Sequence, residues 1–167
     1  MINFLLDKLP CKDRNGLDIR TDFKTWIAFE TMLQNPYNLL SEIETRNDCV
    51  ELIYKEKPSN YEVAFLELIS FNNMYMDISG DDVPKECLFD WVCDGASVYS
   101  AFMKTYGIDL ITLDYMHWWK FKALFRDIDQ NTQLSNAIYY RGIDLSKEKD
   151  PKRRSELAKI KSKFVIK

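Results

Sequence analysis

One stretch constrains the fold more than any other: DLITLDYMHWWKFKALF, from Asp109 to Phe125. Thr112 is a good helix N-cap, so the spacing of apolar residues predicts a helix from about Leu113 to Asp127. The apolar side chains cover well over half of the helix circumference, which is typical of a helix contacted by several others. We therefore expect a helical fold with this segment near its centre.

The adjacent Trp118 and Trp119 admit two interpretations. An exposed aromatic platform with basic neighbours could stack the bases of single-stranded nucleic acid. Stacking needs exposed rings, however, and the many apolar neighbours at helical spacing favour burial, where large aromatic side chains dominate packing. We interpret the pair as core, and the chain's only histidine, His117, as a hydrogen-bonded, partly buried residue.

Further helices follow from caps and apolar spacing. We expect a helix over residues 21–34, capped by Thr21 or Asp22 and ended by Pro36. A second, over residues 59–76 with a Ser59 or Asn60 cap, has a broad apolar arc that indicates a mostly buried helix. Others run from an Asp94 cap to Tyr106, closed by Gly107; over residues 132–142, capped by Thr132; and from an Asp150 cap with Pro151 onward. Residues 41–57 show a weaker pattern, ended by Pro58. Asn15-Gly16 suits a tight turn and predicts a small β-hairpin near the N-terminus.

Together these segments predict a mainly α fold: a compact helical domain of about six or seven helices with a small N-terminal β-hairpin. A length of 167 residues is typical of one domain, 1–167. Within it we expect residues 1–20 to form the hairpin lead-in and residues 147–167 to form a basic, loosely docked C-terminal helix. The clearest loop is SGDDVPKE, residues 79–86, where we expect mobility.

The net charge of −3 hides an asymmetry between the tail and the rest of the chain. Residues 147–167 carry nine Lys or Arg against three acids, which leaves residues 1–146 with 14 against 23. A composition of 46% hydrophobic and 29% charged residues indicates a compact protein, and we expect no signal peptide and no membrane span. The cationic tail could bind nucleic acid, the acidic body or an acidic partner.

Few residues suggest catalysis, a metal or a cofactor. Cys11, Cys49, Cys87 and Cys93 form no CxxC pair, so we expect reduced thiols and no zinc site. With a single histidine and no cysteine placed beside it, nucleophilic catalysis of the Cys-His type is disfavoured. The sequence contains no phosphate-binding glycine loop and no other recognised catalytic motif. We therefore expect a protein without enzymatic activity, cofactor or metal.

The order of several motifs resembles the bacteriophage gene product 15 family of phages and prophages of Gram-positive bacteria. The motifs are TDFKTWIAFE, VYSAFMKTYGIDL, LDYMHWWKFKALF, YYRGIDLSK and a basic end. They include Tyr106, Trp118, Trp119, Lys120, Phe121, Phe125 and Arg141, which enter as motif positions without assigned roles. The resemblance implies a tail protein whose gene lies ahead of the tape-measure gene, a position often held by tail assembly chaperones.

On this resemblance we expect a tail assembly chaperone that acts with the tape-measure protein in the cytoplasm of the bacterial host and that self-associates. The candidate contact is an apolar stripe on the last helix, Leu157, Ile160 and Phe164, with Arg153 and Arg154 beside it. The same stripe could instead pack on the protein's own acidic body, and the surface beside residues 79–86 is a second candidate. The alternatives are a structural component retained in the virion tail and a nucleic-acid-binding module that uses the basic end, which the acidic body disfavours.

Overall fold

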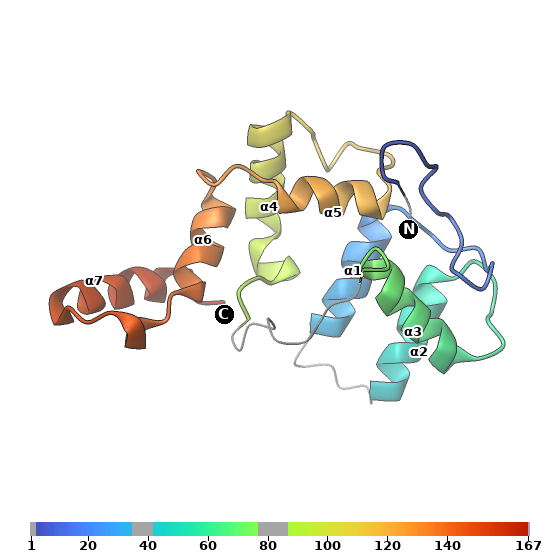
Figure 1. Cartoon of the computed structure of the whole chain (residues 1–167), viewed down its shortest axis with the longest axis horizontal. Helices are drawn as coiled ribbons and strands as arrows, with labels where there is room; N and C mark the ends of the chain where they lie inside the picture. Colours follow the sequence, from blue (N-terminus) through green and yellow to red (C-terminus); the bar gives the residue numbers. More distant parts are fainter. Residues whose placement is uncertain (1–2, 35–41, 77–86, 167) are drawn as a thin grey trace. The chain divides into compact units, whose positions relative to one another are not determined.

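The structure is a computed structural model that describes residues 3–34, 42–76 and 87–166. These residues form seven α-helices and two short 3-10 helices (Figure 1). The mainly α prediction is confirmed. The contacts divide the chain into two compact units: Met1–Ser79 with Asp114–Arg126, and Gly80–Leu113 with Asp127–Lys167. The predicted stop at Pro36 and the whole SGDDVPKE segment lie outside the described residues.

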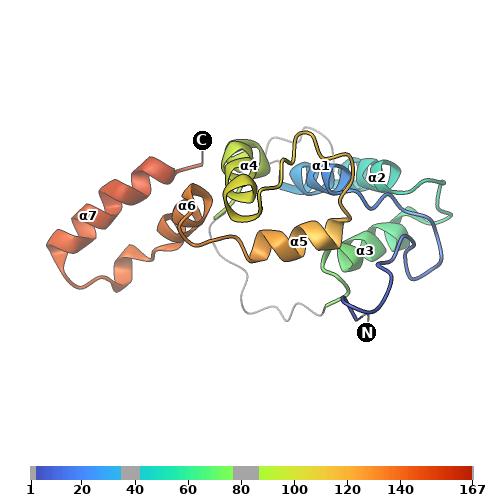
Figure 2. The same ribbon diagram turned by 90° about the horizontal axis from the view of Figure 1, so that it is seen from above.

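The first unit contains four helices: α1 (Phe23–Gln34), α2 (Glu42–Ile53), α3 (Tyr61–Asn72) and α5 (Trp118–Arg126). α2 packs against both α1 and α3, and α5 packs against α1, as the two views of the chain show (Figures 1 and 2). Two of the predicted caps are present. The Asp22 carboxylate accepts a hydrogen bond from the Thr25 amide, and the Asn60 side chain accepts one from the Val63 amide.

An aromatic cluster fills the core of this unit. Trp26 stacks on Phe71 with 5.0 Å between ring centroids and on Trp118 with 6.0 Å, and Phe121 stacks on Trp118 at 5.5 Å. Trp118 and Trp119 are buried, so the core interpretation is confirmed and the rings are not available as a stacking platform. Both indole nitrogens are satisfied: that of Trp118 donates to the Asn72 side chain and that of Trp119 to the Phe71 carbonyl.

The predicted N-terminal β-hairpin is wrong. Residues 11–19 form a turn closed by one isolated bridge between Lys12 and Asp18, and no strand is present among the described residues. The reason is that the returning segment pairs elsewhere. Arg20 donates its amide to the Ile53 carbonyl, and Lys55 donates its amide to the Asp18 carbonyl. The backbone groups that would extend a hairpin ladder are therefore hydrogen-bonded to residues at the end of α2 and just after it.

The helix predicted from Leu113 begins five residues later, at Trp118. The residues before it are extended because they pair with the segment that precedes α1. The Phe23 amide donates to the Met116 carbonyl at 2.9 Å, and the Trp118 amide donates to the Thr21 carbonyl. This pairing starts α1 and α5 side by side and overrides the local Thr112 cap signal.

The second unit contains α4 (Trp91–Tyr106), α6 (Gln133–Gly142), η1 (Leu145–Lys147), α7 (Pro151–Lys161) and η2 (Ser162–Phe164). α6 packs against both α4 and α7. The predicted Asp94 cap of α4 is wrong, because Asp90 caps the helix by accepting from the Cys93 amide. Gly107 closes α4 with a φ of 66°, as predicted. Thr132 and Asp150 cap α6 and α7, also as predicted.

Among the described residues, no helix is long and apolar enough to cross a membrane.

Candidate functional site

The apolar stripe predicted as a partner contact lies on α7 and η2. Leu157, Ile160 and Phe164 are all half-buried. The Phe164 ring stacks on Tyr140 of α6, with 5.4 Å between centroids and an interplanar angle of 6°. The stripe therefore packs at least partly within its own unit, and part of its surface remains open to solvent.

The two arginines named with the stripe are exposed residues near the start of α7. Arg153 forms an ion pair with Glu148 at 3.3 Å. The Arg153 side chain is exposed and the Glu148 side chain is half-buried, and a pair with a solvated arginine contributes little to stability. Both residues are exposed, as a basic surface requires, and their role in binding stays a prediction.

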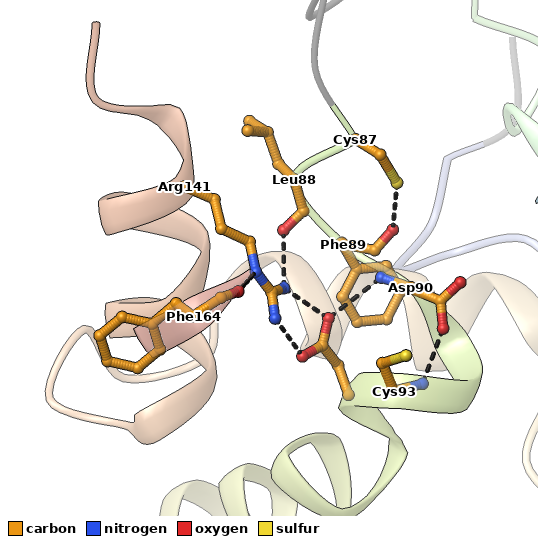
Figure 3. Close-up of polar contacts among 8 residues, drawn as sticks. Cys87, Leu88, Phe89, Asp90, Cys93, Arg141 and Phe164 are labelled. Carbon is orange, nitrogen blue, oxygen red and sulfur yellow. Dashed lines mark hydrogen bonds and ion pairs between the residues drawn. The ribbon is translucent and has the colours of Figure 1, made fainter. Parts of the chain in front are cut away.

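A buried ion pair holds the C-terminal end of the chain against α4 and α6 (Figure 3). The Arg141 guanidinium donates to both Asp94 carboxylate oxygens, at 2.6 and 2.9 Å. It also donates to the carbonyls of Leu88 and Phe164. The side chains of Arg141 and Asp94 are only 10% and 6% exposed. Arg141, a motif position without a predicted role, thus joins four chain segments.

The Arg141–Asp94 pair stabilises the packing of the second unit. The Asp94 carboxylate raises the pKa of Arg141 by hydrogen bonding and charge, so the guanidinium stays charged. Asp94 also accepts the Asp90 amide at 3.0 Å, which satisfies a further lone pair. A planar guanidinium with five donors suits this arrangement better than an ammonium group would.

Of the remaining motif residues, Lys120 is exposed, and the others are buried or half-buried. Trp118, Trp119 and Phe121 are buried in the first unit. Phe125 is half-buried and stacks on Phe121 at 6.0 Å. Tyr106 is half-buried at the end of α4 in the second unit, where it contacts the Phe102 ring. The aromatic residues of the motif therefore pack within both units.

His117 is buried and hydrogen-bonded on both ring nitrogens. Nδ1 accepts the Trp119 amide at 3.1 Å, so Nε2 carries the proton and donates to the Pro10 carbonyl at 2.9 Å. Burial lowers the pKa of His117, and the bond to Pro10 opposes this only in part. The neutral ring thus anchors the N-terminal segment to the start of α5.

A second buried polar cluster lies beside the tryptophans. The Lys122 ammonium donates to the Asn72 carbonyl at 3.0 Å and to Glu30 at 3.3 Å, and the Asn72 side chain donates to Glu30 at 2.9 Å. Burial lowers the pKa of Lys122, and the Glu30 carboxylate opposes that shift. Every member has a partner, which is the arrangement expected of a structural network.

The surface of the first unit carries a groove between α2 and α3 that the sequence did not predict. It encloses about 380 Å³ and is lined by Ile43, Arg46, Asn47, Tyr61, Glu62, Phe65 and Leu66. Ile43 and Leu66 are 69% and 60% exposed. The Arg46 guanidinium lies 5.6 Å from the centre of the Phe65 ring, a cation–π distance. The residues that line the groove therefore combine aromatic rings, aliphatic side chains and one charge of each sign.

One signal in the sequence could have revealed the groove. The apolar arc of the helix over residues 59–76 is broader than one buried face requires, and we interpreted that breadth as burial. In the structure Ala64, Leu68 and Phe71 face the core, whereas Val63 and Leu66 are exposed. The surplus apolar residues on α3 belong to a surface.

In the part of the chain that the structure describes, no group of three or more His, Cys, Asp or Glu residues could hold a metal ion. All four cysteines lie among the described residues and none of them forms a disulfide there; three are exposed. Burial raises the pKa of the fourth, Cys49, to about 11, so this thiol stays protonated.

These features define a helical protein with an apolar surface groove in one unit and a clamped C-terminal helix in the other. The chain belongs to the bacteriophage Gp15 protein family, whose profile matches residues 5–166. The resemblance drawn from the motifs is thus confirmed. Comparisons with curated proteins and with solved structures find no match.

Proposed function

We propose that this phage protein is a non-enzymatic tail assembly chaperone that binds the tape-measure protein before the tail tube forms around it. The observation that carries the proposal is membership of the bacteriophage Gp15 family over residues 5–166. A protein that shields a long, helical, apolar-faced chain needs apolar surface of its own.

The described surface offers such residues in both units. Ile43, Val63 and Leu66 are exposed on α2 and α3, and Val92 and Met103 are exposed on α4. For the tape-measure contact we retain the half-buried stripe of α7, because Leu157 and Ile160 keep part of their surface open beside the basic residues of the same helix.

The proposal is tested by co-expressing the chain with the tape-measure protein encoded beside it. Affinity purification followed by light scattering should recover a soluble complex. The variant Leu157→Asp/Ile160→Asp should lose it, because two charges would enter the apolar contact. Ile111→Asp, at an exposed position of the same unit outside this set of residues, is the control and should still bind. Circular dichroism checks that each variant is folded.

Absence of a complex with the unaltered chain would contradict the chaperone proposal. Mass spectrometry of purified phage particles separates it from the alternative of a structural tail component. A chaperone should be absent from mature particles, whereas a component should occur in fixed copy number.

Nucleic-acid binding through the basic end is the weaker alternative. It predicts affinity for DNA or RNA that falls steeply with salt and that disappears when residues 147–167 are deleted. The structure adds one observation against it, since Arg153 is paired with Glu148 at 3.3 Å.

A further inference from the structure

We propose that copies of this chain associate head to tail, with an apolar turn near the N-terminus of one copy seated in the α2–α3 groove of the next. The turn comprises residues 3–7, and the groove is the one between α2 and α3 described above. The proposal concerns the chain alone and stands whether or not the tape-measure protein is its partner.

The turn at residues 3–7 is a preorganised apolar projection. The Asn3 amide donates to the Asp7 carboxylate at 2.7 Å, and the Asp7 amide donates to the Asn3 carbonyl at 2.8 Å. The Leu5 amide donates to the Asn3 side chain at 3.1 Å. These bonds close the turn while Leu5 and Leu6 stay 91% and 82% exposed. Two adjacent exposed leucines on an ordered turn are suited to insert into an apolar pocket of another molecule.

The turn is held in place on its own unit. Three residues after it, the Pro10 carbonyl accepts the hydrogen bond from buried His117. With Leu5 and Leu6 open to solvent, the turn is not seated in the groove of its own copy. The projection and the groove therefore both remain available on one molecule.

The chemistry of the two surfaces matches. The groove is lined by the aromatic ring of Phe65 and by the aliphatic side chains of Ile43 and Leu66, which suit contact with two leucine side chains. Beyond the leucines, Asp7 of the turn and the following Lys8 are charged, and the groove carries Glu62 and Arg46, which pairs with the exposed Glu42 at its edge. Each charge on the turn thus has an opposite charge among the lining residues, which favours seating and gives it a direction.

Such a contact joins two different surfaces, so it does not close on itself in a pair. A heterologous contact generates rings when the rotation closes and open helical filaments when it does not. Because the surfaces are small, we expect weak association, with a Kd of roughly micromolar to millimolar. The chain alone should therefore assemble in a concentration-dependent way.

The test uses two variants of the full chain that each disable one side. Leu5→Asp/Leu6→Asp removes the turn, and Ile43→Asp/Leu66→Asp removes the groove walls. All four positions are exposed, so both variants should fold. Val92→Asp/Ile111→Asp, at two exposed positions of the other unit, is the control. Sedimentation velocity at increasing concentration measures the association.

We expect the average mass of the unaltered chain and of the control to grow with concentration. Each one-sided variant should associate at least roughly thirtyfold more weakly. When the two variants are mixed, the intact turn of one meets the intact groove of the other. The mixture should therefore form a pair of one copy each and grow no further.

Three results would overturn the proposal. One is an unaltered chain that stays monomeric up to roughly millimolar concentration, the weak end of the expected range. Another is a Leu5→Asp/Leu6→Asp variant that assembles like the control. The third is a mixture of the two variants that forms no pair, because a symmetric interface or an unrelated surface would then explain any assembly. None of these results bears on tape-measure binding, which the co-purification measures separately.

Discussion

The Arg141–Asp94 pair allows a sharp prediction about what holds the second unit together. Replacing Arg141 with Met removes the guanidinium and leaves the Asp94 carboxylate buried without its charged partner. Breaking a buried ion pair on one side costs about 3–5 kcal/mol. The free energy of unfolding of a typical domain is only about 5–15 kcal/mol, so the loss should be large.

The matched control is the same substitution in the same unit at an exposed arginine, whose partner Glu148 is half-buried. Arg153 and Glu148 lie 3.3 Å apart, but the Arg153 side chain is 71% exposed. Arg153→Met should therefore cost less than about 1 kcal/mol. The contrast isolates burial, because both variants lose one arginine and gain one methionine.

Urea unfolding followed by circular dichroism measures the stability of each variant. Hydrogen exchange of peptides from α6 and η2 then locates the loss, since Arg141 also donates to the Phe164 carbonyl. The double variant Asp94→Asn/Arg141→Met and the two single variants form a double-mutant cycle. The double variant should lose less free energy of unfolding than the losses of the two single variants added together. If Arg141→Met cost no more than Arg153→Met, or if the cycle showed no coupling, the pair would not be the clamp described here.

Three further predictions follow from the core, the histidine and the glycines of α4. Trp119→Ala should lower the free energy of unfolding by about 3–5 kcal/mol, and Tyr115→Ala, at an exposed position, by much less in the same urea titration. Because burial lowers the pKa of His117 in the folded state, the unfolded state takes up the proton first. Stability should be full above pH about 6.5 and fall as the pH drops from there towards the folded pKa; thermal melts of His117→Gln should lack this component. Gly107→Ala should destabilise by about 1–2 kcal/mol because φ is 66° there, whereas Gly95→Ala, inside α4 with open space around it, should stabilise by about 0.5–1 kcal/mol. A stabilising Gly107→Ala or a destabilising Gly95→Ala in calorimetry would refute the assignment.

The elements predicted correctly are those that local signals define. Asn60, Thr132 and Asp150 each cap a helix through a side chain that bonds an amide two or three residues on. Such bonds need only neighbouring residues, so a pattern of residue types suffices to find them. The burial of the tryptophan pair followed in the same way from helical spacing.

The errors arose where distant segments compete with local signals. Thr112 resembles an N-cap, but the residues that follow it pair with the segment before α1, which is about ninety residues away in the sequence. Asp94 resembles a cap as well as Asp90 does, and only the position of Arg141 on α6 explains why it is buried. Ile19 forms a bridge with Tyr54 in place of a hairpin ladder.

The candidate surfaces were predictable to different degrees. The stripe of α7 was visible because its spacing is helical, although its stacking of Phe164 on Tyr140 was not. The α2–α3 groove depends on which apolar residues of two helices are left over after packing. The sequence alone does not show that Ala64 is buried and Leu66 exposed, because it does not show which face of α3 packs against the core.

The pairing of residues 21–23 with residues 116–118 has a consequence for synthesis on the ribosome. α1, α2 and α3 emerge first, but the aromatic core that they surround lacks Trp118, Trp119 and Phe121 until α5 has been made. At about 5–20 residues per second, the interval between Asn72 and Trp118 lasts roughly 2 to 9 seconds. During that interval Trp26 lacks the ring of Trp118 and Phe71 lacks the ring of Trp119, so these aromatic side chains are less covered while the second unit is being made. Newly made copies are thus most prone to misassociation before residue 126 leaves the exit tunnel.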